Sequence, residues 1–344
     1  SGAASAGGVV SNQDLQEEIE ALAKVVGDPA AEAALARARE LVPRLENSPA
    51  AQREFVEKLR EVLGGGIEDQ DEEAPPAVLD LPGDQVFERL SKPLPRAASG
   101  GQGGGAGGAA GGVGSGGQAA DAAGSAAGLG VLSGIKGAGM KLLNLTTYYK
   151  MKDRAGVVGR DGLNPLLRQL RAKKPALKLH LVGHSFGGRL VTAAALGKDG
   201  QEPVKPDTLT LLQAAFSHYG FSGDYEDGKP GFFRKVVGQV GGPILISHTR
   251  NDKAVGVAYP LASQLARQVA SALGDKDSRW GGIGANGAQK TGEVVEGQLL
   301  AVGGAYQLAK GKVYNLNADT FIKGHSDIDK AEVAHAVLTA VAGT

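Results

Sequence analysis

The sequence His-Leu-Val-Gly-His-Ser-Phe-Gly-Gly, at positions 180–188, decides the fold class of this chain. A short apolar run leads into it, residues 177–182, and the run 190–196 after it has a helical composition. The pattern predicts a strand, a tight turn at Ser185 and a helix. A serine on such a strained turn needs neighbours without a Cβ atom. We therefore expect the turn to require Gly183 and Gly187, with Gly188 leaving room for the helix.

Strand and helix patterns alternate along the rest of the chain from about residue 163. Strands are predicted at 208–212, 243–248 and 313–316, and helices from Asn164 and at 255–273 and 330–341. Alternation of this kind is typical of a parallel sheet with right-handed crossovers. The expected fold class is therefore α/β, a mainly parallel sheet with flanking helices.

Three regions are expected from the composition of the chain. Residues 1–95 are an acidic helical region, residues 96–128 a Gly/Ala-rich linker, and residues 129–344 the α/β domain. In the first region, apolar residues at helical spacing, capped by Ser11 and Ser48, predict helices at 11–26, 30–45 and 48–63. The apolar stretch 129–149 has too many interruptions to span a bilayer, and we expect an ordinary lid or core helix there rather than a membrane-surface segment.

Charge is distributed unevenly although the formal net charge is zero. Residues 1–95 hold 19 acidic and 9 basic side chains, which leaves 18 of the 37 acidic and 28 of the 37 basic side chains for the remainder. We interpret the acidic part as docking on, or solubilising, the basic remainder of the same chain. No dense run of lysine and arginine with interleaved aromatic residues is present, so no nucleic-acid partner is expected.

The composition also excludes several classes of site. The chain has no cysteine, which rules out disulfides, thiolate zinc sites and a cysteine nucleophile. The first residues lack an initiator methionine and a signal-peptide pattern, so we expect a processed or cut chain and, by default, a cytoplasmic location.

Three polar residues each follow a predicted strand, where functional groups of parallel sheets gather. Ser185 follows the first strand, Asp252 the third and His325 the fourth. Serine becomes a good nucleophile when a histidine takes its proton, and an acid orients that histidine. We therefore expect Ser185 as nucleophile, His325 as base and Asp252 as acid. The backbone N–H of Phe186, at a helix N-terminus, is expected to bind the oxyanion.

Other residues remain as rivals or as substrate contacts. Asp224 and Asp227 are alternatives for the acid, and His180 and His335 are interpreted as packing or surface residues. His218 lies in an aromatic loop and is expected in a pocket wall. The expected substrate-binding residues are His184, Phe216, Tyr219 and Phe221.

The stretch 180–188 resembles the nucleophile elbow of the α/β-hydrolase superfamily of lipases and esterases. The run 151–159 is similar to a little-characterised bacterial branch of that superfamily, and with Asp252 and His325 the resemblance covers about residues 145–344. It implies a Ser-His-Asp acyl-enzyme mechanism with no metal or organic cofactor.

The chain departs from the superfamily pattern before the elbow. No convincing strand precedes Leu177, and the His-Gly motif that often supplies a second oxyanion donor is absent, so that donor is unassigned. Either the sheet is short or its first strands were removed before Ser1. We expect that the first strands were removed, because an uncovered sheet edge tends to pair with other chains.

The expected function is hydrolysis of carboxylic esters, with a small-molecule or lipid ester as substrate. Membrane-surface contact is compatible with a lipid ester, and the sequence does not define an oligomeric state. Two alternatives stay open: an amidase or peptidase with the same triad, and a non-catalytic interaction protein on a hydrolase scaffold.

Overall fold

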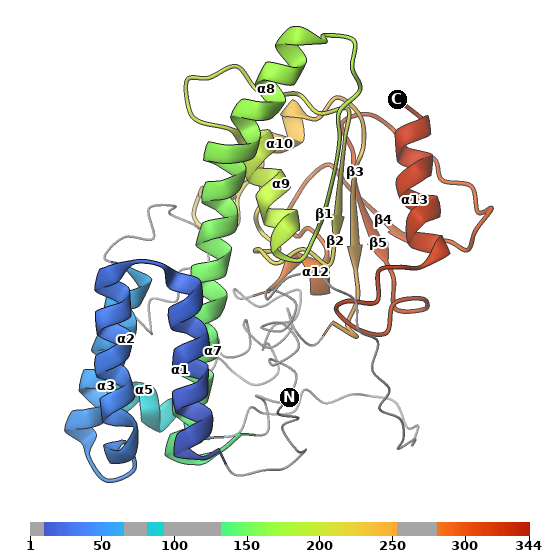
Figure 1. Ribbon diagram of the computed structural model, residues 1–344. Coiled ribbons are helices and arrows are strands. Elements are labelled where there is room, and N and C mark those ends of the chain that lie inside the picture. Colours follow the sequence, from blue (N-terminus) through green and yellow to red (C-terminus); the bar gives the residue numbers. More distant parts are fainter. Residues whose placement is uncertain (1–9, 65–80, 93–131, 253–280) are drawn as a thin grey trace.

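The computed structural model describes residues 10–64, 81–92, 132–252 and 281–344, and its centre is a five-stranded sheet (Figure 1). The strand order is β1-β2-β3-β5-β4, and every neighbouring pair is parallel. The α/β class with a parallel sheet is thus confirmed. The strands are β1 (His180–His184), β2 (Thr208–Leu212), β3 (Ile244–His248), β4 (Val294–Gln298) and β5 (Val313–Asn317).

Three of the four predicted strands agree with the observed β2, β3 and β5 to within one residue. The first predicted strand is displaced, and one observed strand was not predicted. The first strand begins at His180 rather than at residue 177. β4 was not predicted, because it lies at the end of the strand order and its Val-Val-Glu-Gly-Gln sequence is largely exposed, without apolar alternation. The helix predicted at 255–273 lies outside the described residues.

Helices cover both faces of the sheet (Figure 1). On one face, α9 (Phe186–Leu196) and α10 (Arg234–Gln239) pack in a core cluster with strand residues such as Leu209 and Ile246. On the other face, α13 (Ala331–Ala342) packs against Leu245 and Leu316. A short helix, α12 (Ile283–Asn286), lies next to β3.

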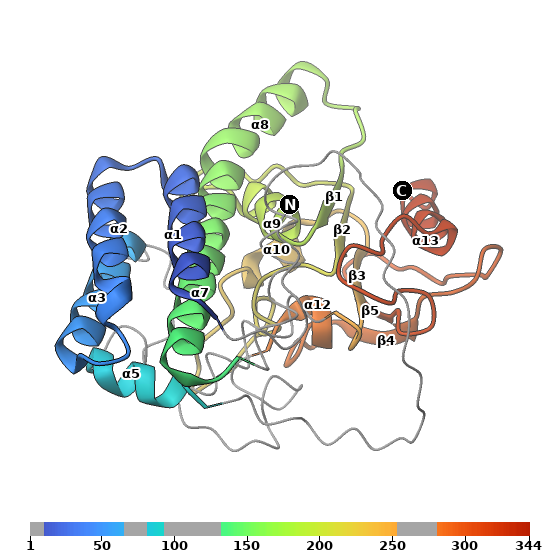
Figure 2. The same ribbon diagram turned by 60° about the horizontal axis from the view of Figure 1, so that its bottom comes forward.

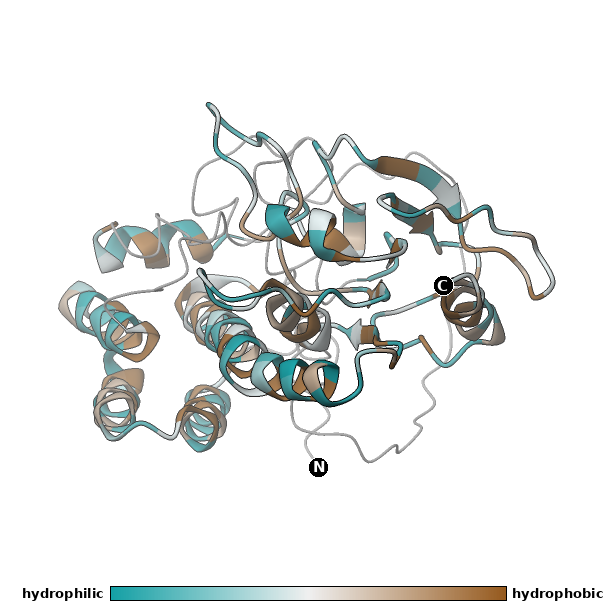
Figure 3. Cartoon of the chain, turned by 90° about the horizontal axis from the view of Figure 1, so that it is seen from above, coloured by the Kyte–Doolittle hydropathy of each residue, from teal (hydrophilic) through white to brown (hydrophobic). Residues whose placement is uncertain are grey.

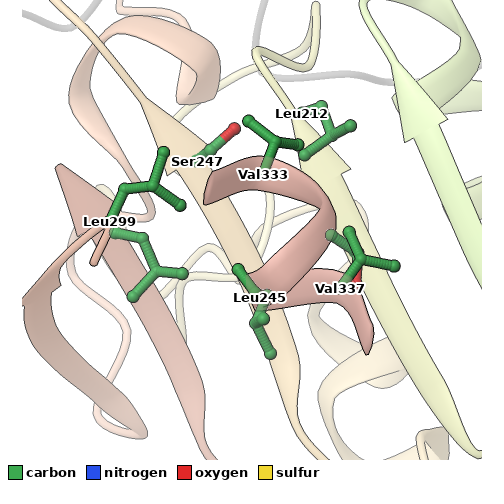
Figure 4. Close-up of a pocket in the computed structure, with 9 residues that line it drawn as sticks. Leu212, Leu245, Ser247, Leu299, Val333 and Val337 are labelled. Carbon is green, nitrogen blue, oxygen red and sulfur yellow. The ribbon is translucent and has the colours of Figure 1, made fainter. Parts of the chain in front are cut away.

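A small pocket lies between α13 and the sheet (Figure 4). Apolar side chains from α13 and the strands form most of its wall, together with the hydroxyl-bearing residues Thr210 and Ser247. Both residues are buried, and among the described residues neither hydroxyl oxygen has a hydrogen-bond partner. The space therefore leaves two polar atoms unsatisfied inside an apolar layer.

The N-terminal residues form a separate bundle of helices, the helical unit. Ser11 and Asp14 form a capping box, Ser48 caps its helix through Ala51 N–H, and Gly27 ends the first helix with a φ of 59°, which confirms these predicted boundaries. The second helix ends at Leu41, before the 3-10 turn Val42–Arg44, and not at residue 45. A fourth helix, at Gly83–Leu90, was not predicted. The helices are α1 (Asn12–Val26), α2 (Pro29–Leu41), α3 (Pro49–Leu63) and α5 (Gly83–Leu90).

One long helix joins this unit to the sheet region. α7 (Gly134–Val157) continues through the π-helix Val158–Leu163 into α8 (Asn164–Lys173), and Figures 1 and 2 show the run passing from one region to the other. The first half of α7 lies in the core of the helical unit, which therefore extends beyond the boundary expected at residue 128. The π-helix that follows α7 crosses α9 closely, since a Cβ atom on Gly159 would lie 2.1 Å from Leu190 O.

Figure 3 looks along several of these helices and shows that each carries a hydrophobic and a hydrophilic side. The buried sides meet in one cluster, to which α7 contributes Leu142, Leu143 and Leu145. Within the described part of the chain, no helix is long and apolar enough to cross a membrane.

The end of α5 meets the start of α7. Gly134 N–H donates to Ser91 O at 2.8 Å, and the buried Lys141 ammonium donates to Leu90 O at 2.9 Å and to Lys92 O at 2.8 Å. The segment 93–131, which includes the expected linker, lies outside the described residues. The described residues on its two sides thus lie close together in the helical unit.

β1 forms the other end of the strand order, and the described residues pair it with β2 alone. Val182, in the middle of β1, is 43% exposed. Within the described residues, no strand precedes β1 in the chain.

Candidate active site

Ser185 occupies the turn between β1 and α9 in a backbone conformation that is rare for a residue with a side chain. Its φ is 55° and its ψ is −126°. Its N–H donates to Leu212 O at 3.1 Å, and its carbonyl accepts from Gly188 N–H and Ala215 N–H, both at 3.0 Å. Strained residues persist only where the surroundings hold them. Here the end of β2, the loop after it and the first turn of α9 supply those hydrogen bonds.

The glycines around Ser185 do not all have the expected role. A Cβ atom on Gly183 would lie 2.3 Å from Gly187 O, and one on Gly188 would lie 2.5 Å from Ala214 Cβ. A Cβ atom on Gly187 would meet nothing within 4 Å. The expectation that the turn requires Gly187 is therefore wrong, and the space constraint falls on Gly183 and Gly188.

The structure brings Ser185, His325 and Asp252 together. His325 Nε2 lies 2.8 Å from Ser185 Oγ, and His325 Nδ1 lies 2.8 Å from Asp252 Oδ2. The side chain of Asp252 is fully buried and that of His325 is 9% exposed. A carboxylate can only accept, so Nδ1 carries the proton of a neutral His325 and Nε2 is left to accept from the serine hydroxyl. This is the tautomer that a general base needs.

A hydrogen-bonded bridge ties the loop of Asp252 to the loop of His325. Asp319 accepts from Thr249 Oγ1 at 2.8 Å and from Arg250 N–H at 2.9 Å, while Asn251 Nδ2 donates to Ile322 O at 2.8 Å. Burial alone would raise the pKa of Asp319. The hydrogen bonds that its carboxylate accepts, first among them those from Thr249 and Arg250, outweigh burial and lower the pKa. The sequence reasoning missed Asp319, although it follows β5 as Asp252 follows β3.

His184 lies against His325 rather than at an open substrate surface. Its Nε2 is 2.8 Å from the backbone oxygen of His325, and the two ring centroids are 4.8 Å apart. Burial is the main cause that lowers the pKa of His184.

The aromatic residues expected to bind substrate are packed inside the protein. Phe216 is 1% exposed and Phe221 is 0% exposed, and both lie in the core cluster beside α9 with Phe233. Tyr219 is buried and stacks on Tyr225 with centroids 5.8 Å apart. The prediction that Phe216, Tyr219 and Phe221 bind substrate is therefore replaced by a role in packing.

The rival acids and histidines make other contacts. Asp224 Oδ1 accepts from Gly228 N–H at 2.9 Å within a turn, and Asp227 occupies the same turn with a φ of 50°. Three further histidines have ring nitrogens near other partners: His180 near Thr208, His218 near Asn286 and His335 near Gly304. His218 is 0% exposed, so it is not part of an open wall.

Phe186 is the first residue of α9, and no carbonyl within that helix accepts its N–H. Its ring packs 5.2 Å from the ring of Tyr148, which comes from α7. Ala155 and Met151 of α7 belong to the same small cluster as Phe186. The shared helix thus reaches the position expected to bind the oxyanion.

Within the described residues, no group of three or more histidine, aspartate or glutamate side chains could hold a metal ion. Comparison of the chain with protein-family models, with curated proteins and with solved structures found no match. The chemistry of the site therefore has to be argued from its geometry.

Proposed function

We propose that the protein is a serine hydrolase that cleaves carboxylic esters through an acyl-enzyme. The single observation that carries this proposal is His325, which bridges Ser185 Oγ and Asp252 Oδ2 with two contacts of 2.8 Å. The strained backbone of Ser185 at the carboxyl end of a parallel strand supports it, as does the likeness of the elbow to that of α/β-hydrolases.

In the first half of the proposed reaction, Ser185 Oγ attacks the ester carbonyl while His325 Nε2 takes the hydroxyl proton. The negative charge that develops on the carbonyl oxygen is stabilised by Phe186 N–H at the start of α9. Asp252 stabilises the imidazolium and holds its orientation. His325 then gives its proton to the leaving alkoxide as the C–O bond breaks.

In the second half, water replaces the alcohol. His325 takes a proton from that water, the hydroxide attacks the acyl carbon, and the bond to Ser185 Oγ breaks as His325 returns the proton to it. The products are a carboxylic acid and an alcohol. The half-buried, apolar Tyr148 and Met151 beside Phe186 favour an acyl group with an apolar surface.

Labelling with a fluorophosphonate tests the nucleophile. We expect the wild type to be labelled and Ser185→Ala to remain unlabelled, with the label on the peptide that contains residue 185. Equal labelling of both proteins would contradict the proposal.

Turnover of short p-nitrophenyl esters tests the other two residues. We expect His325→Gln and Asp252→Asn each to lower kcat by roughly 10⁴-fold, because triad residues act as a unit. Matched p-nitroanilides separate esterase from amidase activity, and faster cleavage of the anilides would replace the ester by an amide in the proposal.

A further inference from the structure

Two consecutive residues of the elbow hold opposite ends of the same histidine. Ser185 Oγ is 2.8 Å from the ring nitrogen Nε2 of His325, and His184 Nε2 is 2.8 Å from the main-chain oxygen of His325. The rings of His184 and His325 also lie next to each other in a tilted arrangement, with centroids 4.8 Å apart and an angle of 40° between their planes. The two elbow residues thus contact His325 at its Nε2 atom, beside its ring and at its backbone oxygen.

The partner of His184 fixes which nitrogen of its neutral ring carries the hydrogen. A carbonyl oxygen only accepts, so His184 Nε2 must carry a hydrogen and donate it. In the neutral ring Nδ1 is then unprotonated. Among the residues that the structure describes, the titratable groups that face His184 are His325 and Asp252, and burial favours the neutral form. A neutral His184 adds no positive charge beside His325 when that residue becomes an imidazolium.

The two sides of this contact differ in structure. His184 ends β1, one residue before the turn at Ser185 that leads into α9. His325 lies in residues 318–330, a stretch without helix or strand between β5 and α13. Asp319 anchors the start of that stretch to the Asp252 loop. The bond from His184 is a second anchor, and it acts at His325 itself.

We propose that His184 is a positioning residue, whose Nε2–H bond to the carbonyl of His325 holds the base in line with Ser185 Oγ. This inference rests on the proposed function, because it assigns the residue that aligns the base of that reaction. It also replaces the substrate-binding role expected for His184 from the sequence.

Two substitutions separate donor from ring. His184→Phe keeps an aromatic ring but has no donor, whereas His184→Gln keeps an N–H donor without the imidazole. For His184→Phe we expect kcat on a short ester to fall roughly 10- to 100-fold with KM within about twofold, because a base displaced by about 1 Å loses rate rather than binding. His184→Gln should recover most of that loss.

A substrate-binding role for His184 would give the opposite division, with a raised KM and an unchanged kcat, and that result would overturn the inference. So would equal losses of kcat in both variants. His180→Phe, on the same strand but with its ring nitrogen near Thr208, is the matched control and should keep the wild-type kcat.

Proton NMR tests the contact without turnover. The Nδ1–H of His325, shared with Asp252, should give a far-downfield resonance in the wild type and in His184→Gln. It should broaden or vanish in His184→Phe, where the loop opens to solvent exchange. An unchanged resonance in that variant would refute the positioning role, whereas failure of the wild type to react with fluorophosphonate would refute the proposed function instead.

Discussion

Gly183 and Gly187 stand symmetrically on either side of Ser185, but they occupy very different spaces. The Cβ position of Gly183 is filled by the backbone of Gly187 and Gly188, and that of Gly187 is open. The motif alone cannot reveal this difference, because it depends on how tightly α9 leaves the strand. The sequence therefore predicted a turn with glycines on both sides of Ser185, but it could not show which of these glycines the packing requires.

Two alanine substitutions test this asymmetry. Gly183→Ala should lower the free energy of unfolding by about 2 kcal/mol or more, because backbone atoms must move to admit the methyl group. Gly187→Ala should leave it unchanged or raise it by up to about 1 kcal/mol, since alanine is the better helix former. Urea unfolding followed by circular dichroism measures both, and equal destabilisation would contradict the assignment.

Thr210 and Thr208 lie two residues apart on β2 and differ in the state of their hydroxyls. That of Thr210 has no partner among the described residues, whereas that of Thr208 lies 2.9 Å from His180 Nδ1. Removing an unsatisfied buried hydroxyl is favourable, and removing a paired one is not. Thr210→Val should therefore raise the free energy of unfolding by about 1 kcal/mol and Thr208→Val should lower it, as measured by urea unfolding. A loss of stability in Thr210→Val would show that its hydroxyl is satisfied, for instance by water.

At the scale of the elements, the proximity of the three site residues was predictable, because each of them follows an apolar strand in the chain. Strand ends of a parallel sheet lie at one edge, so Ser185, Asp252 and His325 had to come close. β4 and α5 escaped prediction for a different reason. β4 is an exposed edge strand without alternation, and α5 is an eight-residue helix after Pro82 that no side chain caps.

Lys141 of α7 makes the stability of the helical unit depend on pH. Burial lowers the pKa of its ammonium from 10.5 to about 8. Between these two values the unfolded chain binds more protons than the folded one, so the free energy of unfolding rises as the pH increases from 8 to 10.5. The expected gain from this residue is about 2 to 3 kcal/mol.

The measurement is urea unfolding at several pH values from 7 to 10.5 for the wild type and for Lys141→Met. The difference between the two proteins isolates Lys141 from other titrating groups. We expect it to shift in favour of the wild type as the pH rises. A difference that does not change with pH would contradict the pKa assigned to Lys141.

Over the whole molecule, the helical unit and the sheet region have separate cores, and the described residues on either side of segment 93–131 lie together within the helical unit. The segment 93–131 starts and ends beside the contact of Ser91 with Gly134. Replacing it with a flexible linker of about six residues should keep the fold and raise the free energy of unfolding by about 1 to 2 kcal/mol, because a shorter loop loses less entropy on closure. Urea unfolding and fluorophosphonate labelling measure the two effects. Loss of the cooperative transition would show that the segment contributes to the folded structure.

The helix that runs from Gly134 to Lys173 gives the two cores a common backbone. Its first half is buried among α1, α3 and α5, and its later part supports the helix that begins at the elbow. Local unfolding of one core would remove packing from the shared helix, and the other core depends on that helix. The two regions should consequently melt as one cooperative unit, and an inhibitor held at Ser185 should slow hydrogen exchange in α1, a helix that lies outside the candidate site.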